Sequence, residues 1–299
     1  MKAPRILKPL WNSSLPATNN GTNVSLPYSI IYSRIDHRFM TEKHIFLSDV
    51  HYGAFDDETN RQVGTDLIRL IEYCKINKIQ LHILGDLFDY WMEYPNHKPE
   101  LGEHILGHFR QLISELGPIL YITGNHDNWT RGYFEELGFD VEPEFRLMKF
   151  GNRTALLHHG DGLNNPRMQL PRPWFHRLLR NKHFISVYQF LLPPPAGLSL
   201  MKKFSEHCRK RPIAGVERLN EWSREYLSKN DVDFVICGHD HIPRVETFSS
   251  GTYINSGTFY SHRTLVYYTN GDFELVVWNG KDNTLTPFTG HSKLIHDEQ

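Results

Sequence analysis

The sequence predicts an α/β fold in which a parallel sheet packs against a second sheet. Strand-like runs alternate with helix-like stretches between residues 43 and 125, which is typical of a parallel sheet. After residue 231 the chain is rich in strand-like runs, which indicates the second sheet. With 299 residues, 39% of them hydrophobic, the chain is long enough and apolar enough to bury a large core.

The first half of the chain supplies the parallel strands and the helices between them. The strand-like runs cover residues 44–49, 79–86, 119–125 and 154–161. Helices are expected between the first three of these runs, over residues 61–78 and 100–115. Apolar residues recur at helical spacing in the first helix, at Val63, Leu67, Leu70, Ile71 and Cys74.

The last third of the chain supplies the strands of the second sheet. Alternating or apolar runs cover residues 233–240, 244–257 and 264–278. Asn270 and Gly271 stand between two alternating runs, and this dipeptide favours the tight turn of a β-hairpin.

Composition divides the chain into a domain, an insertion and two tails. Residues 1–39 are rich in Asn, Ser, Thr and Pro without periodicity and predict a poorly ordered tail, with an edge strand at 29–32 as the alternative. We expect the domain to span residues 40–290 and a second tail to span 291–299. Within the domain, residues 163–215 are basic and apolar without a strand pattern, so we interpret them as a helical insertion.

Charge and cysteine content exclude several classes of protein. The 33 basic and 34 acidic residues give a net charge of −1, which argues against nucleic-acid binding by the whole surface. Three widely spaced cysteines form neither a disulfide framework nor a zinc motif. No apolar run approaches the roughly 20 residues that span a bilayer, so we expect a cytoplasmic protein. The 18 histidines, by contrast, suggest metal binding or acid–base chemistry.

Five short blocks place potential metal ligands where a strand runs into a loop. They are Ser48–Gly53, Gly85–Trp91, Gly124–Asp127, His159–Asp161 and Gly238–His241. Strand ends in an open α/β sheet converge on one crevice, so these blocks should meet. In the Asp49-x-His51 pair, residues i and i+2 of a strand point the same way, which would put both ligands on one side of the chain. His239 and His241 repeat this spacing.

The order of these blocks resembles the calcineurin-like metallophosphoesterase superfamily over residues 43–262. The resemblance implies a two-sheet β-sandwich flanked by helices, with two divalent metal ions at the strand ends. One metal would be held by Asp49, His51, Asp86 and His241, and the other by Asp86, Asn125, His159 and His239. Such a pair of cations can clamp a phosphoryl group and activate a water molecule. Manganese is expected, and these ligand types also suit iron, cobalt or zinc.

The resemblance also assigns supporting roles around the metals. His126 would contact the phosphate or protonate the leaving oxygen, with Asp127 orienting it. Only one of the successive strand residues His158 and His159 can face the metals, and His159 is preferred because it precedes Gly160 and Asp161. Asp89 and Asp240 are expected to support the ligands rather than bind metal.

Within the superfamily, the chain resembles the UDP-2,3-diacylglucosamine hydrolases of lipid A synthesis. The matching features are GDLFDYW, the insertion after HGD, and GHDHIPR. The resemblance implies hydrolysis of the pyrophosphate of a UDP-linked glycolipid to UMP and 2,3-diacylglucosamine 1-phosphate, with the insertion as a lid. The implied substrate contacts are Asn125, His126, Lys202, Lys203, Ser205, Arg209 and His239.

The composition of the insertion suits a lipid substrate, but other functions stay open. Its aromatic and aliphatic residues could line an acyl channel or could simply pack the insertion onto the domain; they are Phe184, Tyr188, Phe190, Leu191 and Leu192. Its basic helices suit contact with the anionic inner face of a membrane. The family carries Arg where this chain has His126, so another phosphodiester, a nucleotide or a phosphoprotein is the alternative substrate. A non-catalytic scaffold is a third hypothesis, and the oligomeric state is left open.

Overall fold

The computed structural model describes residues 42–209 and 216–290, except for the side chains of 207–209 and 216. These residues all belong to one compact unit. The expected tails at 1–39 and 291–299 and the alternative strand at 29–32 lie outside the described residues.

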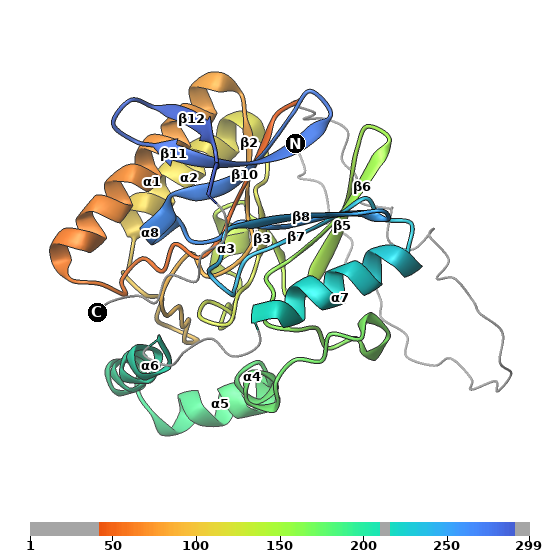
Figure 1. Ribbon diagram of the computed structural model, residues 1–299. Coiled ribbons are helices and arrows are strands. Elements are labelled where there is room, and N and C mark those ends of the chain that lie inside the picture. The colour runs from red at the N-terminus through yellow and green to blue at the C-terminus, as the bar shows by residue number, and fades with distance from the viewer. Residues whose placement is uncertain (1–41, 210–215, 291–299) are drawn as a thin grey trace, which may run out of the picture. The chain divides into compact units, whose positions relative to one another are not determined.

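The larger sheet has seven strands in the order β12-β11-β10-β1-β2-β3-β4 (Figure 1). Its strands are β1 (His44–Leu47), β2 (Gln80–Ile83), β3 (Leu120–Ile122), β4 (Asp140–Glu142), β10 (Thr264–Thr269), β11 (Asp272–Asn279) and β12 (Thr284–Pro287). Strands β1 to β4 pair in parallel, whereas β10 pairs antiparallel with β1 and continues as an antiparallel meander. The predicted parallel sheet therefore exists, but residues 264–278, expected in the second sheet, extend it as an antiparallel meander. The run at 154–161, expected among the parallel strands, contributes β6 to the smaller sheet instead.

The smaller sheet has five strands in the order β5-β6-β7-β9-β8. They are β5 (Phe145–Phe150), β6 (Arg153–His158), β7 (Phe234–Cys237), β8 (Arg244–Phe248) and β9 (Gly251–Asn255). The helices are α1 (Asp57–Asn77), α2 (Glu103–Leu116), α3 (Tyr133–Glu136), α4 (Trp174–Leu179), α5 (Lys182–Leu191), α6 (Pro194–Arg209), α7 (Val216–Lys229) and α8 (Phe259–His262), with a 3₁₀ turn η3 (Pro166–Met168).

Alternating side chains along the strands build the layers. In β1, Ile45 and Leu47 pack against the core that includes α1 and α2, whereas Phe46 points into the core between the two sheets. In β7, Val235 packs with Trp222 of α7 on the outer face of the smaller sheet. Helices therefore flank a two-sheet sandwich, which confirms the expected fold class.

Local sequence signals explain where the elements begin and end. Helix α1 begins four residues before the expected start, because Asp56 caps it by accepting a hydrogen bond from Thr59 N at 2.9 Å. The predicted hairpin joins β10 to β11, with positive φ values of 52° at Asn270 and 88° at Gly271. The sequence did not predict β4, β5, β12, α3, α7 or α8.

The insertion contains helices α4, α5 and α6, which lie beyond the strand ends in Figure 1. Trp129 of the domain anchors them: its Nε1 donates to Leu179 O at 2.7 Å, and its ring meets those of Phe184 and Tyr188 at 6.4 and 5.0 Å. Phe184 and Tyr188 therefore pack the insertion onto the domain, which was the alternative to lining an acyl channel. Phe190 is 87% exposed and cannot line a channel.

Candidate metal centre

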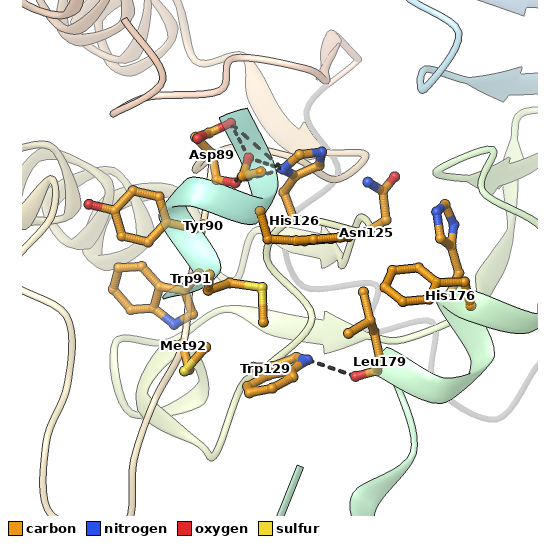
Figure 2. Close-up of a pocket in the computed structure, with 13 residues that line it drawn as sticks. Asp89, Tyr90, Trp91, Met92, Asn125, His126, Trp129, His176 and Leu179 are labelled. Atoms are coloured by element: carbon orange, nitrogen blue, oxygen red, sulfur yellow. Dashed lines mark hydrogen bonds and ion pairs between the residues drawn. The ribbon is translucent and has the colours of Figure 1, made fainter. Parts of the chain in front are cut away.

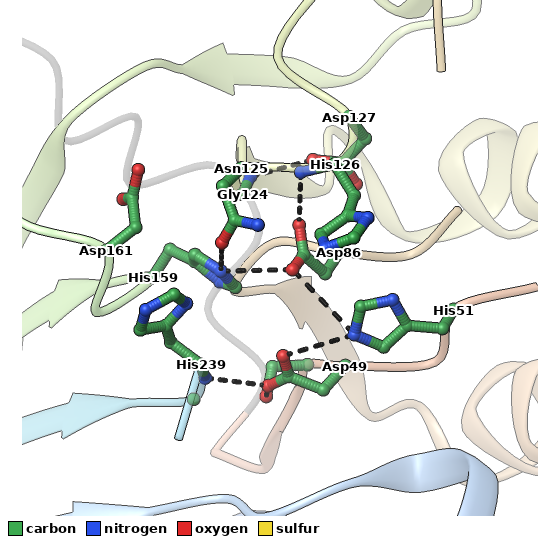
Figure 3. Close-up of polar contacts among 12 residues, drawn as sticks. Asp49, His51, Asp86, Gly124, Asn125, His126, Asp127, His159, Asp161 and His239 are labelled. Carbon is green, nitrogen blue, oxygen red and sulfur yellow. Dashed lines mark hydrogen bonds and ion pairs between the residues drawn. The ribbon is translucent and has the colours of Figure 1, made fainter. Parts of the chain in front are cut away.

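The predicted ligands from all five blocks lie together at one end of the two sheets (Figure 3). Asp49 follows β1, Asp86 follows β2, Asn125 follows β3, His159 follows β6 and His239 follows β7. Backbone hydrogen bonds tie the loops to one another, since His51 N donates to Asp86 O at 3.0 Å and Gly238 N donates to His159 O at 2.9 Å. Chain segments far apart in sequence thus form one polar cluster.

The backbone at these ligands is not extended, so strand alternation is the wrong explanation for the Asp-x-His spacing. Ten non-glycine residues in the described chain have positive φ, and five of them are predicted ligands. Their φ values are 51° at Asp49, 47° at His51, 53° at Asp86, 74° at His239 and 61° at His241. Left-handed turns after the strands, rather than the pleat, direct both side chains of each pair. Such backbone strain is concentrated at functional sites in proteins.

The first half of the cluster contains Asp49, His51 and His241. His241 Nε2 lies 3.3 Å from Asp49 Oδ1 and 3.2 Å from His51 Nε2. Asp49 is fully buried, and its Oδ1 accepts no well-formed hydrogen bond from the described residues. The three side chains offer ligand atoms close enough to share one cation.

The second half contains Asp86, Asn125, His159 and His239. Asp86 Oδ2 lies 3.2 Å from His159 Nε2 and 3.8 Å from His51 Nε2, so this oxygen faces both halves of the cluster. His159 Nε2 is also 3.1 Å from Asn125 Oδ1. The ring of His239 meets that of His159 at 5.0 Å, and His239 N donates to Asp49 Oδ2 at 3.0 Å. Asp86 therefore lies between the two halves of the cluster.

The buried carboxylates make the cluster attractive to cations. Burial opposes ionisation of Asp86, but His159 and His126 outweigh it and hold the pKa of Asp86 well below its usual range. Burial likewise opposes protonation of His51, but contacts with Asp49 and Asp89 raise its pKa to about 10. Burial lowers the pKa of His239 to about 3, so its imidazole is neutral and able to bind a metal.

Asp127 does not orient His126, contrary to the sequence-based expectation. Its carboxylate turns away from the cluster and accepts hydrogen bonds from Leu87 N at 2.8 Å, Gly124 N at 2.7 Å and the Tyr121 hydroxyl at 2.6 Å. Asp127 therefore fixes the loops that carry Asp86 and Asn125.

Asp89 takes the place expected for Asp127. His126 Nδ1 lies 2.7 Å from Asp89 O, and Asp89 Oδ1 lies 3.6 Å from both His126 Nδ1 and His51 Nδ1. The buried Ser205 from α6 completes this contact, with its hydroxyl 3.0 Å from Asp89 Oδ1. Asp89 was expected to support the ligands, and its carboxylate lies beside the predicted ligand His51 and beside His126.

Two residues close to the ligands, His158 and Asn255, make structural contacts of their own. His158 is buried against Trp222, with the rings 5.2 Å apart, and burial lowers its pKa to about 3. Asn255, which the sequence analysis missed, donates to Gly238 O at 2.8 Å and to Asp240 Oδ1, and so holds the loop that carries His239. Its only sequence signal is its place at the end of a strand, before Ser256 and Gly257.

Of the substrate contacts expected in the insertion whose side chains the structure describes, only Ser205 lies at this centre. Ser205 reaches His126, at 3.1 Å from Nδ1, whereas Lys202 and Lys203 are exposed. The side chain of Arg209 lies outside the described residues. Arg180 makes a contact that the sequence did not predict: its guanidinium lies 3.1 Å from Asp161 Oδ2 and donates to Gly124 O at 2.7 Å.

A cavity of about 80 Å³ lies between the insertion and the metal-binding loops (Figure 2). Its walls combine polar and apolar side chains, namely Asp89, Tyr90, Trp91, Met92, Asn125, His126, Trp129, Phe175, His176, Leu179, Met201, Phe204 and Ser205. The five residues proposed for an acyl channel are not among them. The apolar walls on the insertion side come instead from Phe175, Leu179, Met201 and Phe204.

The model of the calcineurin-like phosphoesterase family matches residues 43–243. The chain belongs to this family. It is therefore a metal-dependent hydrolase with candidate metal-binding histidine and aspartate groups at the expected place. No helix in the described part of this phosphoesterase is long and apolar enough to cross a membrane.

Two curated relatives of this phosphoesterase share one name. The UDP-2,3-diacylglucosamine hydrolase of Porphyromonas gingivalis is 28% identical over 225 residues, which cover 68% of this chain and 84% of the relative. That of Vibrio cholerae is 23% identical over 241 residues, covering 75% and 93%. A solved E. coli phosphoesterase covers 81% of this chain and 96% of its own, with 14% identity and a TM-score of 0.40.

Proposed function

We propose that this phosphoesterase uses a two-metal centre to hydrolyse the pyrophosphate of UDP-2,3-diacylglucosamine. The convergence of the seven predicted ligands, with Asp86 between the two halves of the cluster, carries the two-metal part of the proposal. Asp49, His51, Asp86 and His241 would hold one divalent cation, and Asp86, Asn125, His159 and His239 the other. Imidazole, carboxylate and amide donors suit manganese, with iron, cobalt or zinc as alternatives.

The donor set fits a pair of cations. Buried anions gather here, and the Nε2 atoms of His51 and His241 lie 3.2 Å apart, a close approach that a shared cation would stabilise. When bound, two divalent cations polarise a phosphoryl group and lower the pKa of a water molecule. The chain itself fixes the orientation of Asp86, because His126 N donates to Asp86 Oδ1 at 2.9 Å. His126 would contact the substrate phosphate or donate a proton to the leaving oxygen.

The lipid substrate is supported by the names of the relatives and by the apolar walls beside the centre. The cavity of about 80 Å³ is small next to typical ligand pockets of roughly 300–1,000 Å³. Helices α4 to α6 would therefore have to move outward before acyl chains could enter. Lys202 and Lys203 are exposed on α6, so their ammonium groups would be available to bind the phosphates of an approaching substrate.

The test is the release of UMP from UDP-2,3-diacylglucosamine by the purified full chain with manganese. We expect UMP and 2,3-diacylglucosamine 1-phosphate, and loss of both products when metal is removed with EDTA. Hydrolysis of bis-(p-nitrophenyl) phosphate without any UMP release would keep the phosphoesterase and reject the lipid substrate. A nucleotide or phosphoprotein substrate would then be the alternative.

An exposed apolar face on α5 supports action at a membrane surface. Val187, Phe190 and Leu191 are 57%, 87% and 67% exposed, and their spacing puts them on one side of the helix. Exposed Lys182 lies at the start of the same helix. Apolar and basic groups together are typical of peripheral contact with anionic lipid.

Vesicle binding tests this contact. Because burying each large apolar side chain is worth about 1.5–3 kcal/mol, Phe190→Asp with Leu191→Asp should weaken binding to phosphatidylglycerol vesicles about 100-fold or more. Ile76→Asp is the matched control, because Ile76 is 75% exposed on α1. Equal binding by the two variants would contradict a role for α5.

A further inference from the structure

We propose that Ser205 is a positioning residue that lets the insertion set the orientation of His126. The inference rests on the proposed role of His126 in phosphoester hydrolysis. The positioning role differs from the substrate contact that the resemblance implies for Ser205, because here Ser205 acts through Asp89 and His126.

The hydrogen bonds around His126 can be assigned from their chemistry. Asp89 O is a carbonyl and only accepts, so His126 Nδ1, at 2.7 Å, carries the hydrogen and donates it. Ser205 Oγ lies 3.1 Å from the same nitrogen and can accept a share of that hydrogen. The hydroxyl proton of Ser205 then points to Asp89 Oδ1 at 3.0 Å. Ser205 thus bridges the histidine and the aspartate.

This bridge joins the insertion to the metal-binding loops. Ser205 is 4% exposed on α6, whereas Asp89 follows β2 and His126 follows β3. Figure 2 shows Asp89, His126 and the contacts that converge on them. On its other side, the His126 ring meets the ring of His51 edge-on at 4.8 Å. A displacement of α6 would remove one of the groups that hold the imidazole next to the centre.

A double-mutant cycle on a small substrate tests the inference, because bis-(p-nitrophenyl) phosphate has no lipid or uridine to contact Ser205. Ser205→Ala should lower kcat roughly three- to tenfold, the effect of one hydrogen bond, with KM unchanged within about twofold. In a His126→Ala background, Ser205→Ala should change kcat by less than about twofold, because the group it positions is gone. Ser205→Thr, which keeps the hydroxyl, should recover most of the activity.

Controls separate this role from folding and from substrate binding. Ser186→Ala on α5 removes a hydroxyl that, among the described residues, donates to Lys182 O of its own helix, and this variant should behave as the unmodified chain. Thermal unfolding of each variant reports on folding. Full additivity of the two substitutions would overturn the inference, as would an effect of Ser205→Ala confined to the KM of the lipid substrate. A non-additive cycle without UMP release would reject the proposed lipid substrate and keep the inference, whereas no hydrolysis of either substrate would overturn both.

Discussion

Replacing Gly124 by Ala should disable the centre without unfolding the protein. A Cβ at residue 124 would lie 2.0 Å from Asp86 Oδ1 and 2.6 Å from Asp86 N. Real Cβ atoms essentially never approach closer than 3.0 Å, so the Asp86 carboxylate must retreat by about 1 Å and the Gly124 loop must also move away from the Asp86 backbone. Asp86 faces both halves of the cluster, so both proposed metal sites should be affected.

A displacement of about 1 Å at reacting groups costs about 10²-fold in rate, or about 2.7 kcal/mol of transition-state stabilisation. We therefore expect Gly124→Ala to lower kcat/KM for bis-(p-nitrophenyl) phosphate about 10²-fold. We also expect a loss of bound manganese after dialysis, measured by mass spectrometry.

Gly107→Ala is the matched control. Gly107 is exposed on α2, and an added Cβ there meets nothing within 4 Å. Replacing glycine by alanine inside a helix should stabilise it by roughly 0.5–1 kcal/mol. Full metal content and activity in Gly124→Ala would refute the argument that the Gly124 loop fits closely around Asp86.

Three further predictions follow from the same contacts. His159→Gln should lose bound metal and activity, whereas His158→Gln should keep both. Metal analysis of the two variants is the test, and equal metal loss would contradict the assignment of His159 as the ligand. Arg180→Met leaves buried Asp161 with Arg172 at 3.1 Å and His176 at 3.9 Å, and it should lower the free energy of unfolding by about 2 kcal/mol, measured in urea; no change would contradict a stabilising role. His241→Gly should be more stable than His241→Ala by about 1 kcal/mol without metal, because glycine relieves the strain at φ 61°; the usual order, with alanine more stable, would refute that strain.

The sequence predicts the ligands well because their signal is local. Each block places a carboxylate, amide or imidazole directly after an apolar strand, and the strand ends of such sheets converge whatever lies between them. Some contacts of Asp127 and Arg180 are different, since partners such as Leu87 N and Gly124 O are backbone groups that any residue carries. No pattern of side chains marks such partners. The exposure of Phe190 could not be predicted either, because an amphipathic pattern does not show whether an apolar face of a helix packs against the domain or is exposed to solvent.

The least predictable feature is the backbone conformation of the ligands. A left-handed residue other than glycine costs on the order of 1 kcal/mol or more, and Asp and His tolerate it only somewhat better than other types. Glycine would remove this strain but would supply no ligand. The loops hold the conformation through contacts between segments: Asp49 N donates to Gly85 O at 3.1 Å, and His239 N donates to Asp49 Oδ2 at 3.0 Å. The strain therefore persists only when all the loops are assembled, so it is a property of the folded site and leaves no mark in any single motif.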